Sequence, residues 1–259
     1  MLRWCAHCQQ FIGEMPPHAD LSITHGLCRK CSGEQPDLLS DDGFAHAVVL
    51  RDIFQALFAA GRSNDFDAAG PLVDRAIVAN CRPVDILVGM IAPMLYEIGR
   101  AWERGTLTVA DEHEFTAFAE RVVDLVEARM NRASSQRTRF AGDGRYFLMN
   151  APGNTHVVGI RILALWLQNR GWQTRHVDER TVLDVLSEPS LAGEPKTLLV
   201  SIALPEQCEA VRALVGRMQA LPASSRPKIV LGGYAVKTRL VPRIPGVVLA
   251  RDISALGLD

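Results

Sequence analysis

The sequence predicts an α/β fold: a flavodoxin-like, doubly wound, five-stranded parallel sheet, preceded by a four-helix bundle and an N-terminal zinc knuckle. Three observations predict it. Residues 145–259 alternate short apolar runs with amphipathic segments, as parallel sheets with crossover helices do. Residues 45–133 contain four helical periodicities joined by short turns. Residues 1–34 contain two Cys-x-x-Cys pairs. We therefore expect three domains, at 1–34, 45–133 and 145–259.

Length and charge narrow the class of protein. The chain has 259 residues, enough for two compact domains, and a net charge of −1. That charge does not favour nucleic acid or an acidic membrane surface, and residues 1–34 balance three basic against three acidic side chains, so direct DNA binding is not the favoured reading. No apolar run reaches the roughly 18 residues of a spanning helix. No charged and apolar leader opens the chain, so we expect a cytoplasmic protein.

The two cysteine pairs predict a metal site. Cys5 and Cys8 are separated from Cys28 and Cys31 by 19 residues, a spacing typical of zinc ribbons. In a reducing compartment such pairs bind metal more often than they form disulfides. So short a segment buries little core, and we expect the metal to supply its folding energy. Three histidines remain alternative ligands for one thiolate: His7, His18 and His25.

The helical region follows a polar linker expected at 35–44. The first helix is expected from Ala47 to Ala60 and to stop at Gly61, and the second runs from Asp65 to about Asn80. Pro83 occupies a first-turn position of the third helix, which stops at Gly105. Thr108 and Asp111 have the spacing of a capping box at the start of the fourth. Short connections make neighbouring helices antiparallel, so a bundle follows.

A second linker, basic and serine-rich, is expected at 129–145, before the α/β region. Five strands are expected there: Tyr146–Asn150, Gln173–Val177, Thr197–Ile202, Lys228–Leu231 and Val247–Leu249. The crossover helices are expected at Val158–Arg170, Arg180–Ser187 and Glu206–Leu221, with a short helix after Gly233. Right-handed crossovers leave one crevice at the carboxyl edge of such a sheet.

Three loops are expected to converge on that crevice. The first carries His156 directly after the first strand, and the second is Ser201-Ile202-Ala203-Leu204-Pro205. The third is Gly232-Gly233, where the missing Cβ atoms permit close approach of a bulky ligand or, equally, a tight turn between strand and helix.

The turn between the third and fourth helices brings a further set of residues together. Trp102 precedes the turn, and Glu112 and His113 follow it. Read individually, the tryptophan is a core aromatic, the glutamate stabilises a helix N-terminus and the histidine faces solvent. Read together, they form a candidate binding surface at one end of the bundle.

The combined motifs resemble those of cobalamin-binding proteins. The family form is Asp-x-His-x-x-Gly, then Ser-x-Leu or Ser-x-Thr, then Gly-Gly, after a four-helix cap with a Gly-x-x-Trp/Phe-x-x-Gly stretch. This chain has Asn154-Thr155-His156-Val157-Val158-Gly159, Ser201-x-Ala203, Gly232-Gly233 and Gly99-x-x-Trp102-x-x-Gly105. Trp102 followed by Glu112-His113 is similar to the motif of CarH-type B12 photoreceptors, and AerR and PpaA antirepressors are related. The resemblance spans about residues 45–255.

The resemblance implies a role for each matching position. His156 would be the lower axial ligand of cobalt. The displaced dimethylbenzimidazole tail would occupy a slot lined by Ser201, Ala203, Leu204 and Gly232-Gly233. Trp102, Glu112 and His113 would cap the upper face. The neighbours of His156 (Asn154, Thr155, Val157 and Gly159) would complete the cofactor-binding loop.

Two departures from the family motif refine this reading. Asn154 stands where relatives have aspartate, and an amide orients the ligating histidine without adding charge. Corrinoid methyl carriers use that carboxylate to manage protons, so its loss favours a protein that holds its cofactor. Glu103 stands where some photoreceptors have a second cobalt-binding histidine, and His113 is then the nearest replacement donor.

The resemblance therefore implies a cobalamin-binding sensor, not an enzyme. We expect a B12-dependent photoreceptor or antirepressor that binds adenosyl-, methyl- or hydroxocobalamin and regulates transcription through a protein partner or self-association. Two alternatives keep the fold. One is a corrinoid carrier protein of a methyltransferase system, and the other is a sensor in which His156 binds haem.

Overall fold

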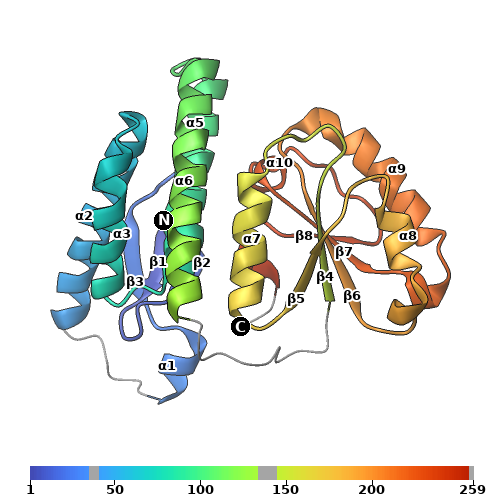
Figure 1. The fold of residues 1–259 in the computed structure, drawn as a ribbon, viewed down its shortest axis with the longest axis horizontal. Helices are drawn as coiled ribbons and strands as arrows, with labels where there is room; N and C mark the ends of the chain where they lie inside the picture. The colour runs from blue at the N-terminus through green and yellow to red at the C-terminus, as the bar shows by residue number, and fades with distance from the viewer. Residues whose placement is uncertain (35–40, 134–144, 257–259) are drawn as a thin grey trace. The chain divides into compact units, whose positions relative to one another are not determined.

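The computed structural model describes residues 1–34, 41–133 and 145–256, which belong to two compact units, one helical and one α/β (Figure 1). The two linkers predicted at 35–44 and 129–145 are shorter than expected. Residues 41–44 already belong to a helix and residues 129–133 still do, while 35–40 and 134–144 lie outside the described residues. Both helices extend through polar sequence that we had assigned to linkers. No described helix combines the length and apolarity needed to cross a membrane.

The N-terminal segment is a small sheet with a short helix. Its strands are β1 (Leu2–Cys5), β2 (Phe11–Glu14) and β3 (Ile23–Gly26), in the order β2-β1-β3, and α1 (Arg29–Glu34) follows. Strand β1 pairs antiparallel with β2 and parallel with β3. We call residues 1–34 the ribbon. Its β1 end and the start of α1 carry the four cysteines.

The ribbon shares a core with the helical bundle. Leu2 and Trp4 are fully buried, and Phe11 nearly so. Strand β2 packs against the third helix and β3 against the first. The apolar side chains of the ribbon are therefore covered by the helical bundle, a long-range contact that the local sequence does not reveal.

The bundle consists of the four helices that the sequence predicts. They are α2 (Asp41–Arg62), α3 (Phe66–Val78), a third helix made of α4 (Pro83–Ile86), η1 (Leu87–Ile91) and α5 (Ala92–Glu103), and α6 (Val109–Ala133). Asp65 caps α3 by accepting a 3.2 Å hydrogen bond from the Ala68 amide. The Thr108 amide donates to Asp111 at 2.8 Å and the Asp111 amide to the Thr108 hydroxyl at 3.2 Å, so the predicted capping box is confirmed.

Two details of the bundle differ from the sequence prediction. Gly61 does not stop the first helix, which continues to Arg62. A Cβ atom at Gly61 would lie 2.5 Å from the Phe115 ring, so this glycine allows α2 and α6 to approach closely. The third helix contains a π-helical turn, η1, which periodicity alone does not distinguish from a regular helix.

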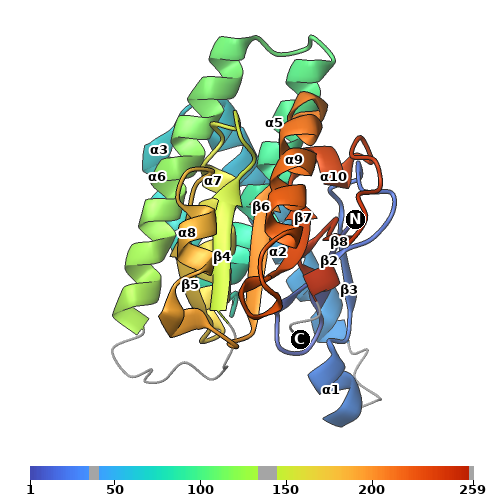
Figure 2. The same cartoon turned by 90° about the vertical axis from the view of Figure 1, so that its right-hand side faces the viewer.

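The second unit is the predicted flavodoxin-like sheet. Its strands are β4 (Arg145–Asn150), β5 (Gln173–His176), β6 (Lys196–Ser201), β7 (Lys228–Gly232) and β8 (Val247–Leu249). They are all parallel, in the order β5-β4-β6-β7-β8, and Figure 2 shows β4 between β5 and β6. The principal helices are α7 (Val158–Asn169), α8 (Val182–Leu186), α9 (Cys208–Gln219) and α10 (Tyr234–Lys237). Four 3-10 turns complete the unit: η2 (Pro189–Leu191), η3 (Pro205–Gln207), η4 (Ala223–Ser225) and η5 (Ile253–Leu256).

The sheet is covered on both faces, as doubly wound folds require. Helix α7 lies on one face and α8 and α9 lie on the other (Figure 1). The larger core is on the α8 and α9 side, where Phe147, Val200 and Leu231 of the central strands meet Val185 and Leu214 of the helices. This packing fixes the carboxyl ends of β4, β6 and β7, and the three predicted loops leave the sheet there.

Candidate functional site

The loop after β4 is held by hydrogen bonds that leave its histidine free. Asn154 is 9% exposed, and its side-chain nitrogen donates to the Ser201 carbonyl oxygen at 2.9 Å. Its side-chain oxygen accepts the His156 backbone amide at 3.0 Å, and the Asn150 side chain donates to the His156 carbonyl at 3.3 Å. The backbone of His156 is thus fixed, while its exposed imidazole has no hydrogen bond within the described part of the chain.

The surroundings of His156 are open. Thr155 and Gly159 are exposed, and Val157 is 53% exposed although it is apolar. A Cβ atom added at Gly159 would have nothing within 4 Å. Gly159 is therefore not required by packing within its own unit. Together these residues offer an open and partly apolar surface around an unpaired imidazole.

The Ser201 and glycine loops lie beside this surface, as predicted. The carbonyl of Ser201 joins β6 to Asn154, and the backbone amides of Ala203 and Leu204 donate to the Gln207 side chain at 2.9 and 3.2 Å. The Gln207 side chain is buried, and it accepts these two amides in place of backbone carbonyl oxygens. Sequence reasoning missed Gln207, because the helix was expected to start at Glu206, whereas the observed N-cap is Leu204 and Gln207 is the third residue after it.

The two adjacent glycines have different reasons to be glycine. Gly233 has φ +95° and a Cβ atom there would lie 2.5 Å from the Ile202 carbonyl oxygen, so the tight turn requires it. A Cβ atom at Gly232 would meet only the Ala250 carbonyl oxygen, at 3.5 Å. The turn reading therefore explains Gly233, while Gly232 is free of that constraint.

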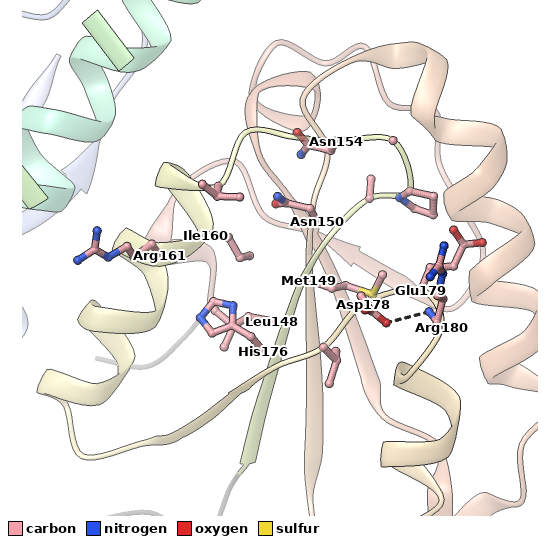
Figure 3. Close-up of a pocket in the computed structure, with 15 residues that line it drawn as sticks. Leu148, Met149, Asn150, Asn154, Ile160, Arg161, His176, Asp178, Glu179 and Arg180 are labelled. Atoms are coloured by element: carbon pink, nitrogen blue, oxygen red, sulfur yellow. Dashed lines mark hydrogen bonds between the residues drawn. The ribbon is translucent and has the colours of Figure 1, made fainter. Parts of the chain in front are cut away.

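A pocket of about 580 Å³ opens on the β5 side of the histidine loop (Figure 3). The loop after β4 forms one wall through Asn150 and Asn154, and Asp178, Glu179 and Arg180 form another. Ser201, Ala203, Gly232 and Gly233 are not among its lining residues. The side-chain oxygen of Asn150 is buried without a hydrogen-bond partner. We did not predict this pocket, because its second wall comes from a polar loop without a recognisable motif.

The cap residues lie in the helical unit, on either side of the turn between α5 and α6. Trp102 is 39% exposed, which is high for a tryptophan and argues against the core-aromatic reading. Glu112 accepts a 2.9 Å hydrogen bond from the Thr116 hydroxyl and lies 3.6 Å from the His113 ring. The His113 side chain is 72% exposed. The turn thus presents an exposed indole and an exposed imidazole, with the Glu112 carboxylate between the Thr116 hydroxyl and the His113 ring.

The four ribbon cysteines converge as their spacing predicts. Their sulfur atoms all lie within 4.8 Å of one another, and Cys8 and Cys28 are 3.7 Å apart. A tetrahedral zinc with bonds of about 2.3 Å places sulfur atoms about 3.8 Å apart, so the cluster needs little contraction to bind metal. Of the three histidines, His7 alone is recorded beside the cluster, its Nδ1 3.4 Å from the Cys31 sulfur.

Hydrogen bonds prepare one thiol of the cluster for deprotonation. Burial would raise the pKa of Cys5, but the backbone amides of Cys8 and Cys28, 3.5 and 3.4 Å away, lower it to about 7. Burial raises the pKa of Cys8 to about 11. A cation bound at the centre would offset that burial cost, because metal ligands must be thiolates.

Comparison with known proteins finds a family similar to the helical unit. Residues 53–127 match the model of the B12 binding domain family. These residues run from α2 through α6 and include the turn after Trp102, so the region similar to that family contains the cap residues.

Two relatives extend the comparison beyond residues 53–127. The chain is 27% identical over 201 residues to the HTH-type transcriptional repressor CarH of Myxococcus xanthus, covering 77% of this chain and 62% of CarH. The match therefore spans less than two thirds of that relative. The fold is similar to that of the monomethylamine corrinoid protein of Methanosarcina barkeri, with a TM-score of 0.65 and 16% identity over 80% of this chain and 95% of the other. This similarity shows a shared fold over four fifths of the chain.

Proposed function

We propose that this protein is a cobalamin-binding sensor that regulates transcription through a protein partner or through self-association, with light as the stimulus. The observation that carries the proposal is the fixed backbone and unpaired imidazole of His156 at the carboxyl edge of this sheet. The match to the B12 binding domain family and the similarity to a transcriptional repressor support it. Its free cysteine thiols suit a reducing compartment, and we place the protein in the cytoplasm.

The residues present fit a corrinoid. An unpaired imidazole supplies a nitrogen ligand for cobalt. Val157 and Gly159 leave the approach to it open, and Val157 already exposes apolar surface for a large ring to cover. We assign His156 as the lower axial ligand, with Asn154, Thr155, Val157 and Gly159 around it. Ser201, Ala203, Leu204, Gly232 and Gly233 would line the nucleotide tail.

The cap residues would control the upper face. When bound, cobalamin supplies a light-sensitive bond between cobalt and carbon. The exposed indole of Trp102 would cover the upper ligand and exclude water from it. Glu112, which accepts a hydrogen bond from Thr116, would orient polar groups there, and the exposed ring of His113 would be a further nitrogen donor for cobalt.

A spectral experiment tests the lower-ligand assignment. The full chain is loaded with adenosyl-, methyl- or aquacobalamin in the dark, and absorbance and molecular size are recorded before and after illumination. We expect His156→Ala to weaken binding or to give the base-on spectrum, because the imidazole no longer reaches cobalt. His176→Ala, a second exposed histidine at the same sheet edge, is the matched control and should bind as wild type does. Equal spectra for the two variants would refute the assignment.

The corrinoid carrier remains a second candidate function, because the fold is similar to that of a corrinoid protein. The hydrogen bonds of Asn154 argue against it. An amide has no charge and does not take up a proton near neutral pH, and backbone groups already hold both ends of this one, so it cannot relay protons as a carboxylate does. A carrier reduced anaerobically with a methyl donor and partner enzyme should methylate an acceptor, whereas a sensor should not.

The haem alternative is separated by the same reconstitution. Purified protein is offered haemin and cobalamin in parallel, and the Soret band is compared with the corrinoid bands. Uptake of haem without uptake of corrinoid would overturn the proposal, since His156 would then ligate iron.

We further propose that the ribbon cysteines bind one zinc ion. Metal analysis should find about one equivalent of zinc per chain, abolished by Cys5→Ser or Cys28→Ser because the remaining thiolates cannot close a tetrahedral site. Cys208→Ser is the matched control, as this buried cysteine lies outside the cluster. Zinc content that follows Cys208 instead of Cys5 would contradict the site.

A further inference from the structure

The ribbon is fitted to the third helix at a point where no side chain is tolerated. Gly89 lies in the π-helical turn η1, and a Cβ atom there would lie 2.5 Å from the Trp4 ring and 2.8 Å from the Phe11 ring. Those two rings pack edge to face with centroids 5.3 Å apart. The ribbon core and the helix backbone are therefore in direct contact, so neither can shift without moving the other.

A second contact joins the ribbon to α5. The Arg100 guanidinium donates to the carbonyl oxygens of His18 and Ala19, at 3.2 and 3.4 Å. Its Nε donates to Glu97 at 3.0 Å, which holds the guanidinium in place. Arg104 also pairs with Glu97, at 3.1 Å, but makes no hydrogen bond to the described ribbon residues, 1–34. Arg100 is thus the link between this helix and the segment that joins β2 to β3.

A buried ion pair lies at the start of the same helix. Arg82 pairs with the fully buried Asp85 through bonds of 2.6 and 2.8 Å. Burial would lower the pKa of Arg82, but its bonds to Asp85 raise it. This pair fixes the beginning of the helix whose later turns contact the ribbon.

Both ribbon contacts and the Arg82 pair belong to the helix that carries the cap tryptophan. Arg100 is two residues from Trp102 in α5, and Arg82 and Gly89 lie earlier in the same continuous helix. We propose that metal binding by the ribbon and cobalamin binding by the chain are thermodynamically linked through this helix. The proposal rests on the cobalamin and zinc sites proposed above and adds a coupling between them.

The physical basis is a shared ordered state. Zinc fixes the relative positions of the two cysteine pairs and therefore of the ribbon segments between them. Without zinc, the segment around His18 and Ala19 loses that restraint, and Arg100 loses partners that position the end of α5. The free energy needed to order the end of α5 must then come from cobalamin binding, which weakens the observed affinity. Linkage is reciprocal, so cobalamin must also strengthen zinc binding by the same factor.

The test compares zinc-loaded and chelator-stripped full-length protein. Adenosylcobalamin is titrated in the dark and its dissociation constant is read from the corrinoid absorbance. We expect stripping to raise that constant about fivefold or more, the lower end of common allosteric couplings. Reciprocally, bound adenosylcobalamin should slow transfer of zinc to a chromogenic chelator. The same dissociation constant in both metal states would overturn the linkage.

Variants at two arginines test whether the linkage passes through Arg100. Arg100→Met removes the bonds to the ribbon, and Arg104→Met removes a neighbouring pair to the same glutamate without touching the ribbon. We expect the first to reduce the difference between the two metal states and the second to preserve it. Arg100→Lys, which retains a donor, covers the case in which the methionine variant folds poorly. A linkage equally large in Arg100→Met, Arg100→Lys and wild type would show that it does not pass through Arg100.

Hydrogen exchange separates failure of the linkage from failure of the proposed sites. In protein without cobalamin, stripping zinc should speed amide exchange across residues 92–103. Unchanged exchange there would overturn the proposed route. Absence of corrinoid bands in both metal states, or absence of zinc before stripping, would instead contradict the proposed function, and absorbance and metal analysis detect those two outcomes directly.

Discussion

The side-chain nitrogen of Asn154 donates a 2.9 Å hydrogen bond to the carbonyl oxygen of Ser201, which ties the histidine loop to the end of strand β6. An ionised aspartate has no proton for this bond and would place negative charge against a carbonyl oxygen. The asparagine is therefore more than a neutral replacement for the family aspartate. It positions the backbone of His156 by joining two loops.

Asn154→Asp should destabilise the α/β unit at neutral pH. We expect the free energy of unfolding to fall by about 1–3 kcal/mol, because the Ser201 carbonyl oxygen loses one of its two donors and meets a negative charge in its place. A protonated carboxyl group can donate again, so the variant's folded-state pKa should be raised. Its deficit should then shrink as the pH falls through that pKa. Urea unfolding of wild type and variant at neutral pH and at about pH 5 measures both effects. Asn154→Ala is the control, and its deficit should not shrink in this way.

Two glycines of the third helix should respond oppositely to alanine. Gly89→Ala forces a methyl group into the Trp4 and Phe11 rings, and we expect a loss of about 1–3 kcal/mol from overpacking. Gly99→Ala meets nothing within 4 Å and should gain about 1 kcal/mol of helix stability. Thermal unfolding of both variants checks the pair. Equal stabilisation by both would contradict the ribbon docking.

Trp102→Ala should retain bound cobalamin and change its photochemistry. The indole is 39% exposed, so its removal leaves the core of the bundle intact and uncovers the proposed upper face. We expect faster loss of the upper ligand under fixed illumination, followed by the corrinoid absorbance. Val109→Ala, an exposed apolar residue at the start of α6, is the control. Identical rates of photolysis in both variants and wild type would contradict the assignment of Trp102 to the cobalamin site.

Acidification should weaken the packing between β3 and α2. Burial lowers the pKa of His46, whose Nε2 is buried without a partner. Burial and the charge of His46 likewise lower the pKa of His25 on β3. Because the unfolded chain binds protons first, stability is complete above about 6.5, the ordinary histidine pKa, and declines as the pH falls through the lowered values.

His46→Gln should make that decline shallower. Thermal unfolding across the range tests this, and the difference between wild type and variant removes the contribution from zinc release, which both proteins share. A decline equally steep in the variant would show that His46 does not carry it.

Local sequence was enough to predict the elements of the fold. Strand β8 was predicted at Val247–Leu249 and is found there, because a short apolar run between turns has one reading. Asp65, Pro83 and the Thr108 and Asp111 pair marked helix starts correctly, since capping chemistry is local. The convergence of the loops containing Asn154 and Ser201 followed from parallel topology alone.

What sequence reasoning missed depends on contacts between distant segments. Gly61 was taken for a stop, whereas its neighbour is Phe115 on another helix. The packing of Trp4 against Gly89 of the third helix was not predicted, because the two residues are far apart in the sequence. Gln207, Asn150 and the pocket on the β5 side gave no motif, because their partners are backbone groups and a polar loop.

The π-helical turn at Leu87–Ile91 also sets the rotational phase of the helix. A π-turn contains one residue more than an α-turn, and each residue of a helix corresponds to a rotation of about 100°. Everything after η1, including Trp102, therefore points about 100° away from where an uninterrupted α-helix would direct it. Deleting a single residue from this turn would restore a regular α-helix and leave the tryptophan on its present face, whereas regularising the turn without a deletion would move the tryptophan to another face. The direction in which Trp102 points around the helix axis is thus set about three turns earlier, at the turn that contacts the ribbon.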